Sequence, residues 1–304
     1  MLMYDVLALS AAMCWAVGGL IAVAPVRRLG PFAFSRWRML MVALALWAIA
    51  AWAGSWRQLS LQEAGLLALS GLVGICVGDT LMFAALNRLG PRRTSILFST
   101  HSAFSALLGY AVLGEHMSLQ GSMGGLLILA GVVGAIILGR HKDEDHAWER
   151  TNGSPRLGVA LGLLSALCQA PATLIAKPVM AGSWRLDGTV VDPIVASAIR
   201  MSVGCIMHFA LLWMGLPAAR VQAVPTLRDW AMTALNGIVA MGLGMTFILM
   251  ALEKGDVGMV AILSSVTPVL VLPLLWWRLG RPPAPGAWLG AMLTIAGTAL
   301  ILYR

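Results

Sequence analysis

Long apolar runs, separated by short polar joints, recur along the whole 304-residue chain. A helix needs roughly 20 apolar residues to cross a hydrocarbon layer about 30 Å thick. The runs are continuously apolar rather than alternating, which favours membrane helices over the strands of a membrane barrel. The pattern predicts ten spans, at residues 5–25, 31–53, 63–87, 92–113, 118–139, 157–179, 190–215, 229–252, 257–277 and 285–303. We therefore expect an all-α integral membrane protein with ten transmembrane helices.

The composition agrees with membrane helices and excludes several classes of function. Hydrophobic residues make up 59% of the chain and charged residues only 11%, far less charge than the surface of a soluble domain requires. The mean hydropathy is +0.84. All four cysteines fall within predicted spans and form no CxxC pair, and no nucleotide-binding P-loop occurs. The sequence thus predicts no cofactor, no metal site, no ATP-driven pump and no soluble catalytic domain.

Basic residues stand in ones and twos at the ends of spans, so the net charge of +8 does not indicate binding to nucleic acid. Fifteen of the 21 Lys and Arg residues fall at the joints after spans one, three, five, seven and nine. Cytoplasmic joints of membrane proteins carry an excess of Lys and Arg. The bias predicts that these joints are cytoplasmic and that both termini lie outside.

The sequence contains an internal repeat, with one copy on either side of a hydrophilic segment at residues 140–156 that we interpret as a linker. Two five-helix repeats, 1–139 and 157–304, are therefore expected. A shift of 166 positions pairs Gly71 with Gly237, Gly78 with Gly244, Thr80 with Thr246, Ser99 with Ser265 and Gly124 with Gly290. Because five is odd, the second copy must enter the membrane in the opposite direction. Inverted repeats of this kind are typical of secondary transporters.

Each repeat enters its second span through a Pro-x3-Ser-x2-Arg pattern, at residues 31–38 and 193–200, and residues 85–132 read ALNRLGPRRTSILFSTHSAFSALLGYAVLGEHMSLQGSMGGLLILAGV. With the two repeats, these motifs resemble the EamA-type transporters of the drug/metabolite transporter superfamily. The resemblance covers essentially the whole chain. It implies ten helices around a central cavity, lined chiefly by spans one, three, four, six, eight and nine, and alternating access. It also implies efflux of small metabolites, such as amino acids or other amphipathic compounds, across the inner membrane of a bacterium.

Asp79 is the one carboxylate clearly inside a predicted span. Charged groups at bilayer depth cost at least ~2.5–3.5 kcal/mol and usually mark a pathway or a partner. Asp79 lies ten residues before the joint near Leu89 and His101 twelve residues after it, which places both about 15–18 Å deep. We predict that Asp79 and His101 form a hydrogen-bonded pair in the cavity, able to hold or exchange a proton during transport or to orient a polar solute. The alternative is that Asp79 only braces neighbouring helices.

Hydroxyl side chains form a polar stripe on two other spans. Ser99 and Ser102 lie on the fourth span, and Ser265 and Thr267 on the ninth. We predict that these four residues line the cavity, although small hydroxyl residues also allow membrane helices to pack closely. The fourth span departs from the family pattern, because His101-Ser102 stands where members commonly carry a proline.

Two further pairs of residues occupy equivalent places in the repeats. Trp15 and its counterpart Gln169 are predicted to face the centre from the first and sixth spans. A Trp near the middle of a span cannot serve as an interfacial anchor, which favours a place in the cavity wall. Arg38 and Arg200 lie one to two turns inside their spans. For these two, snorkelling to the interface is favoured over substrate binding.

Prolines occur within two spans of the second half: Pro171 and Pro178 in span six, and Pro268 and Pro273 in span nine. A proline removes a backbone donor and allows a helix to bend. We predict that these prolines serve as hinges of moving spans. Spans one and four have no such prolines, so we expect that the halves do not move as mirror images.

These features predict a secondary active transporter, an exporter or exchanger of small amphipathic metabolites. The alternatives are a facilitative channel or uniporter, and an intramembrane enzyme. An aspartyl protease would need a second buried aspartate within reach of Asp79, and a serine protease a GxSG-like motif. Neither is present, so no enzyme activity is expected. The expected partners are a small solute and the lipid bilayer, with protons as a further candidate, and the chain is expected to be a monomer or a homodimer.

Overall fold

Helices and short turns build this protein in its computed structural model, which describes residues 2–138, 154–183, 190–279 and 285–302. These ranges contain no strand. The α-helices are α1 (Leu2–Leu29), α2 (Pro31–Ala53), α3 (Leu61–Ser70), α4 (Thr80–Leu89), α5 (Pro91–Ser99), α6 (His101–Leu113), α7 (Leu119–Leu138), α8 (Pro155–Met180), α9 (Pro193–Trp213), α10 (Leu227–Asn236), α11 (Gly244–Ala251), α12 (Val257–Ser264), α13 (Thr267–Leu279) and α14 (Pro285–Leu302). Between them lie the 3-10 turns η1 (Ser55–Gln58) and η3 (Pro217–Ala219) and the π-helices η2 (Gly71–Asp79) and η4 (Gly237–Leu243).

Ten helical spans follow from these elements. Four of them join consecutive elements: α3-η2-α4, α5-α6, α10-η4-α11 and α12-α13. Within the described residues, nine helical segments are long and apolar enough to cross a membrane, and α7 contributes a shorter apolar stretch at Leu119–Gly134. The expected ten-helix membrane fold is confirmed, and most span limits lie within a few residues of those expected.

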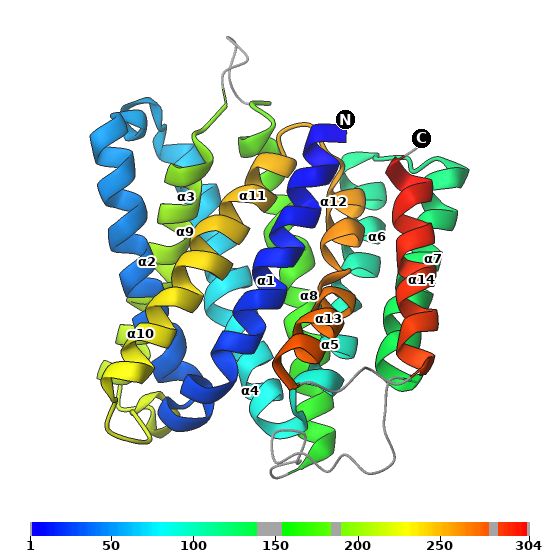
Figure 1. The fold of residues 1–304 in the computed structure, drawn as a ribbon. Coiled ribbons are helices and arrows are strands. Elements are labelled where there is room, and N and C mark those ends of the chain that lie inside the picture. The colour runs from blue at the N-terminus through cyan, green and yellow to red at the C-terminus, as the bar shows by residue number, and fades with distance from the viewer. Residues whose placement is uncertain (1, 139–153, 184–189, 280–284, 303–304) are drawn as a thin grey trace.

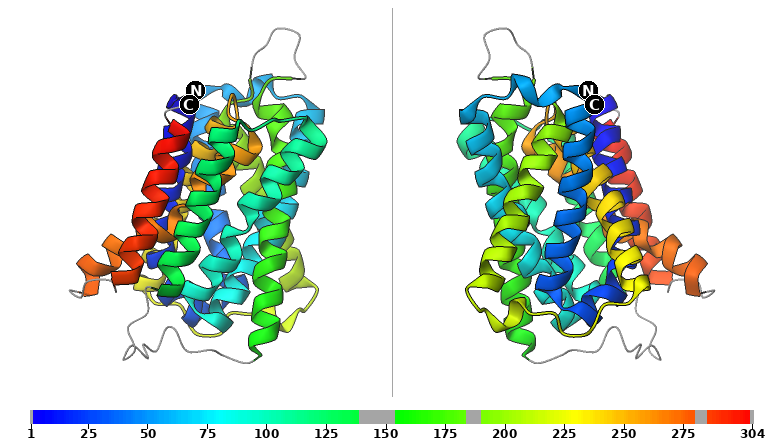
Figure 2. Two further views of the ribbon diagram at one scale, coloured as in Figure 1. Left: turned by 90° about the vertical axis from the view of Figure 1, so that its right-hand side faces the viewer. Right: turned by 90° about the vertical axis from the view of Figure 1, so that its left-hand side faces the viewer.

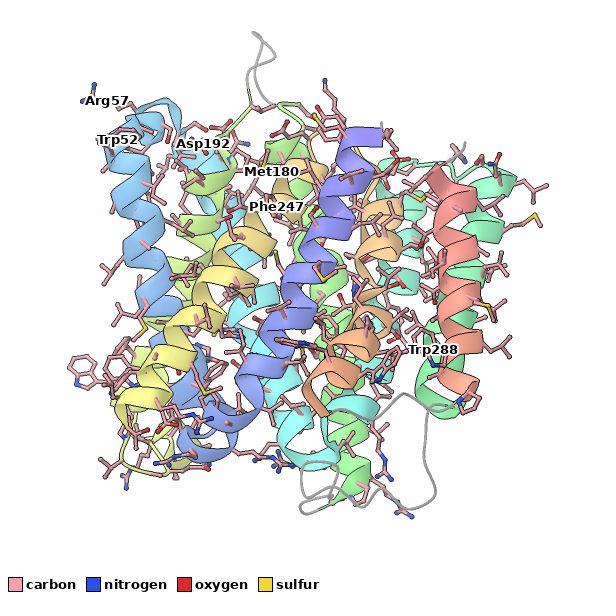
Figure 3. The ribbon with its side chains drawn as sticks, in the orientation of Figure 1. Trp52, Arg57, Met180, Asp192, Phe247 and Trp288 are labelled. Atoms are coloured by element: carbon pink, nitrogen blue, oxygen red, sulfur yellow. The ribbon has the colours of Figure 1, made fainter. Side chains whose placement is uncertain are left out.

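The two halves of the chain run in opposite directions through the molecule. α1 begins and α14 ends at the same end, whereas α8, the counterpart of α1, begins at the other end (Figure 1). Trp52, near the end of α2, and Asp192, which precedes α9, also lie at one end (Figure 3). The counterparts α2 and α9 therefore start at opposite ends, as an inverted repeat requires.

Contacts between helices follow the same symmetry. α2 packs against its counterpart α9 at one edge of the molecule, and α7 packs against its counterpart α14 at the other edge (Figures 1 and 2). α6 of the fourth span packs against α12 of the ninth, and these two spans are counterparts of each other. In the centre, α1 contacts α10, η4 and α11, and α8 contacts α3, η2 and α4. The first span of each repeat is thus held against the third span of the other.

Large apolar side chains are exposed on the outside of this bundle. Trp52, Trp213 and Trp277 are 91%, 93% and 87% exposed. Figure 3 places Trp52 close to Arg57 at one end of the molecule. Tryptophan next to basic residues is typical of the interface between a membrane and water. The apolar outer surface is therefore the surface that meets lipid.

Two spans contain a π-helix at equivalent positions. η2 begins at Gly71 and η4 at Gly237, which the repeat pairs with each other. A Cβ atom at Gly71 would lie 2.7 Å from the Cα of Arg200, and one at Gly237 would lie 2.7 Å from Cγ2 of Val42. Only glycine permits so close an approach. Hydropathy does not register a widened turn, and we expected continuous α-helices here.

The fourth and ninth spans are interrupted at equivalent places, at Thr100 and at Ser265-Val266. In the ninth span, Pro268 lacks the N–H that would bond to the carbonyl of Ser264, and the Thr267 hydroxyl donates to that carbonyl instead, at 2.9 Å. The fourth span is interrupted without any proline. There the hydroxyl of Thr100 donates to the carbonyl of Leu97 at 2.6 Å, so hydroxyl groups bond to backbone carbonyls next to the break in either half.

The predicted hinge prolines lie in different surroundings. Pro171 and Pro178 are inside α8, which continues without interruption from Pro155 to Met180. Pro268 follows the break at the start of α13, and Pro273 lies within that helix. Among these four, Pro268 alone adjoins an interruption. The roles of all four as hinges stay predictions.

Glycines allow the close packing of α7 against α14. A Cβ atom at Gly131 would lie 2.6 Å from the carbonyl oxygen of Gly290, and one at Gly297 would lie 2.6 Å from that of Gly124. Small residues at such crossings let membrane helices approach each other closely.

Replacing Gly131 with alanine should therefore force α7 and α14 apart. Overpacking of this kind typically costs about 1–3 kcal/mol, so Gly131→Ala should lower the thermal unfolding midpoint of the purified protein in detergent. Gly65→Ala is the matched control, because a Cβ there meets nothing within 4 Å. Equal midpoints for the two variants would contradict the tight crossing.

Candidate functional site

Asp79 is the last residue of η2 and is only 4% exposed. Its Oδ2 accepts a hydrogen bond from Nη2 of Arg38 at 3.0 Å, which is also an ion pair. Its Oδ1 accepts a hydrogen bond from Nε2 of Gln169 at 3.1 Å. The carboxylate therefore joins three spans of the bundle, the second, third and sixth.

Arg38 reaches Asp79 from α2 and is 1% exposed. Its guanidinium also lies over the rings of Phe34 and Phe83, at 5.4 Å and 4.8 Å from their centroids. Aromatic faces attract a cation that has lost its water. The expectation that Arg38 snorkels to the interface is wrong, because the ion pair and the two rings hold its charge inside the protein.

Arg200, the counterpart of Arg38, is likewise buried, at 3% exposed. It lies on α9, and its charge interacts with Asp79 over a longer distance. It makes no hydrogen bond or close ion pair with the described residues, and its Nε is buried without a partner. Snorkelling is wrong for this arginine as well.

Trp15 and Gln169 bind the two π-helices in equivalent ways. Nε1 of Trp15 donates to the carbonyl oxygen of Ala240 in η4 at 2.9 Å. Nε2 of Gln169 donates to the carbonyl oxygen of Gly74 in η2 at 3.0 Å. Gly74 and Ala240 are themselves related by the 166-residue shift. Both predicted residues therefore occupy matching places at the centre, and their contact with a solute stays a prediction.

His101 begins α6 and is 7% exposed, with its ring centroid 5.0 Å from that of Phe98. It does not bond to Asp79, so the predicted hydrogen-bonded pair is not formed in the described structure. The reason is the arrangement of helices. η2 packs against α8 and α9, whereas α6 packs against α8 and α12. Equal depth in a helical hairpin did not make the two residues neighbours.

The predicted hydroxyl stripe bonds mostly to backbone at the interruptions. Ser102 donates to the carbonyl of Ser99 at 2.8 Å, and Ser265 to that of Ile262 at 2.7 Å. Thr267 also donates to the carbonyl of Ala12 in α1, at 3.3 Å. In this conformation the donor protons of these three hydroxyls are engaged, and the alternative of a packing role gains support.

His208 was not expected at the site. This residue of α9 is completely buried, with Nδ1 2.8 Å from the carbonyl oxygen of Gly204 and Nε2 2.8 Å from the hydroxyl of Thr80. It therefore ties the seventh span to the residue that follows Asp79. Its position eight residues after Arg200 puts both on one face of a helix, a signal that the sequence contained.

Comparison with known proteins places this fold among transporters. The sequence profile of the EamA-like transporter family matches residues 2–137 and 156–303. A solved structure described as "Crystal structure of protein" is 17% identical, covers 98% of this chain and 95% of its own, and superposes with a TM-score of 0.76. At this identity the likeness shows the fold alone. No curated protein matches the chain.

Removing the second partner of the ion pair should cost less once the first partner is gone. Breaking a buried pair costs about 3–5 kcal/mol because the remaining charge is left alone. Arg38→Met and Asp79→Asn should each lower the thermal unfolding midpoint, and the double variant should lose less than the sum of the two.

The control is the ion pair of Arg28 and Asp229, in which the arginine side chain is 50% exposed. Exposed pairs contribute only about 0–1 kcal/mol, so Arg28→Met and Asp229→Asn should show nearly additive effects. Additive effects at Arg38 and Asp79 would contradict a mutually dependent pair.

Proposed function

Because the chain belongs to the EamA-like transporter family, whose members carry small solutes across membranes, we propose that it is a secondary active transporter that works by alternating access. The proposed solutes are small amphipathic metabolites. The proposed direction is export or exchange across the inner membrane of a bacterium. In the proposed orientation, both termini lie outside.

The observation that carries this proposal is the repeated set of bonds between the halves. Trp15 to Ala240 is matched by Gln169 to Gly74. A second set matches it, in which Asn236 donates to the carbonyl of Gly18 at 2.7 Å and Ser70 to that of Ala172 at 2.6 Å. Two nearly equivalent interfaces can exchange their conformations, which is the basis of alternating access in inverted repeats.

Contacts at the two ends of the molecule also link the halves. Where α1 begins, the carboxylate of Glu115 accepts bonds from the backbone N–H of Val257 at 2.8 and 3.0 Å. Where α1 ends, Arg28 forms an ion pair with Asp229 at 3.3 Å. In the proposed cycle, the contacts at one end break while those at the other end persist.

Asp79 is the proposed site of proton coupling, and His101 is the second candidate. A proton on Asp79 would remove one charge of the ion pair and weaken its hold on Arg38. Since Arg38 lies on α2, a weaker ion pair would loosen α2 from η2, whereas the bond from Gln169 to the carbonyl of Gly74 would still hold α8. Proton uptake would thereby be linked to a change in packing.

A facilitative channel or uniporter is the main alternative, and an intramembrane enzyme is a remote one, since the family is one of transporters. A channel predicts flux that does not saturate and shows no counterflow. An aspartyl protease would pair Asp79 with a second aspartate, but both carboxylate oxygens of Asp79 bond to Arg38 and Gln169 instead.

Transport should be measured in proteoliposomes against a panel of metabolites, as uptake and as counterflow, with and without a pH gradient. We expect saturable counterflow for the wild type. Asp79→Asn should lose the accumulation that the pH gradient drives. It should retain counterflow, because the substitution removes the coupling group and leaves the pathway intact.

Two variants serve as controls in this measurement. Asp192→Asn removes a carboxylate outside the bundle centre and keeps the side-chain cap of α9, so it should transport as the wild type does. His101→Gln tests the second candidate. A gradient response that Asp79→Asn leaves unchanged would exclude coupling through Asp79, and the absence of counterflow in the wild type would exclude a carrier.

A further inference from the structure

The ion pair at Asp79 leaves one positive charge unbalanced. Arg38 and Arg200 are both almost fully buried, and Asp79 is the one carboxylate that interacts with either guanidinium in the described part of the chain. Two cations therefore share one anion at bilayer depth. A buried charge without a matching partner is costly, and it is found in membrane proteins mainly where it serves a function.

Arg200 is the member of this cluster that has no bonded partner. Each carboxylate oxygen of Asp79 already accepts a bond, one from Arg38 and one from Gln169. Arg200 donates no hydrogen bond to the residues that the structure describes, and its Nε is buried and unpaired. Its donors are therefore available to a ligand.

The polar ends of Arg200 and Gln169 meet glycines of η2. A Cβ atom at Gly74 would lie 3.4 Å from Nη2 of Arg200 and 3.3 Å from Oε1 of Gln169. One turn later, a Cβ atom at Gly78 would lie 3.1 Å from Nε2 of Gln169. Two glycines of η2 thus let the polar ends of Arg200 and Gln169 lie directly against the backbone of this helix.

We propose that Arg200 anchors a carboxylate group of the transported solute, an assignment that rests on the proposed transport function. A guanidinium presents a planar fork of donors that matches the two oxygens of a carboxylate. The bound anion brings the cluster to two cations and two anions. A solute with an ammonium group would instead add a third cation, and an alcohol would leave the charge of Arg200 unbalanced.

The test measures binding to the purified protein in detergent as a shift of the thermal unfolding midpoint. The probes are two matched sets that differ only in the polar group: hexanoate, hexanol and hexylammonium, and benzoate, benzyl alcohol and benzylammonium. We expect the carboxylate of at least one set to raise the midpoint, and the alcohols and ammonium compounds to have no such effect.

Variants then assign the effect to Arg200. Arg200→Gln should weaken the carboxylate response by roughly tenfold to a hundredfold in apparent affinity. Arg200→Lys keeps the charge without the fork and should give an intermediate response. Arg57→Gln removes an exposed arginine at one end of the molecule and should respond as the wild type does.

Three results would overturn the assignment: no response to either carboxylate, an equal response to the alcohols or ammonium compounds, or an unchanged response in Arg200→Gln. If Arg200→Gln does not fold, the wild type and Arg200→Lys decide the matter. Binding in detergent requires no transport. Carboxylate binding without counterflow would therefore refute the transport proposal alone, and counterflow of other solutes without carboxylate binding would refute the anchor alone.

Discussion

Every backbone carbonyl inside a membrane needs a hydrogen-bond donor from the protein, because the bilayer core contains no water to supply one. This constraint explains the centre of the structure. Where η2 and η4 widen the third and eighth spans, the side chains of Gln169 and Trp15 bond to the carbonyls of Gly74 and Ala240. Since each donor belongs to the opposite repeat, the same bonds that satisfy the backbone also join the halves.

The backbone at the centre is symmetric, but its charge is not. Arg38 and Arg200 are equivalent, yet the repeat puts Met245 where the first half has Asp79. One carboxylate therefore faces two arginines. Arg38 holds it, supported by Phe34 and Phe83, and Arg200 is left with a long-range attraction. A symmetric scaffold can carry alternating access, while this asymmetric charge can select the solute and respond to a proton.

Prediction of the site succeeded where it depended on one helix and failed where it depended on several. The burial of Asp79 was expected from its place in an apolar run, and it is 4% exposed. The partner of Asp79 was predicted wrongly. α8 contacts both η2 and α6, and the hairpin of spans three and four does not bring His101 to Asp79. Arg38 and Arg200 were not favoured as binding residues because position along a span does not reveal which way a long side chain turns. His208 was missed although its spacing from Arg200 puts both on one face of a helix.

The order of residues by itself determined the ten spans, the duplication and its inversion. Hydrophobic length sets what can cross a bilayer, and an odd number of spans per repeat sets the direction of the second copy. Tertiary structure decided which residues meet. The rotation of each helix, the widened turns at Gly71 and Gly237 and the breaks at Thr100 and Ser265 place Arg38 on Asp79 and leave Arg200 unpaired. Those choices depend on distances between segments far apart in the chain, which local hydropathy does not encode.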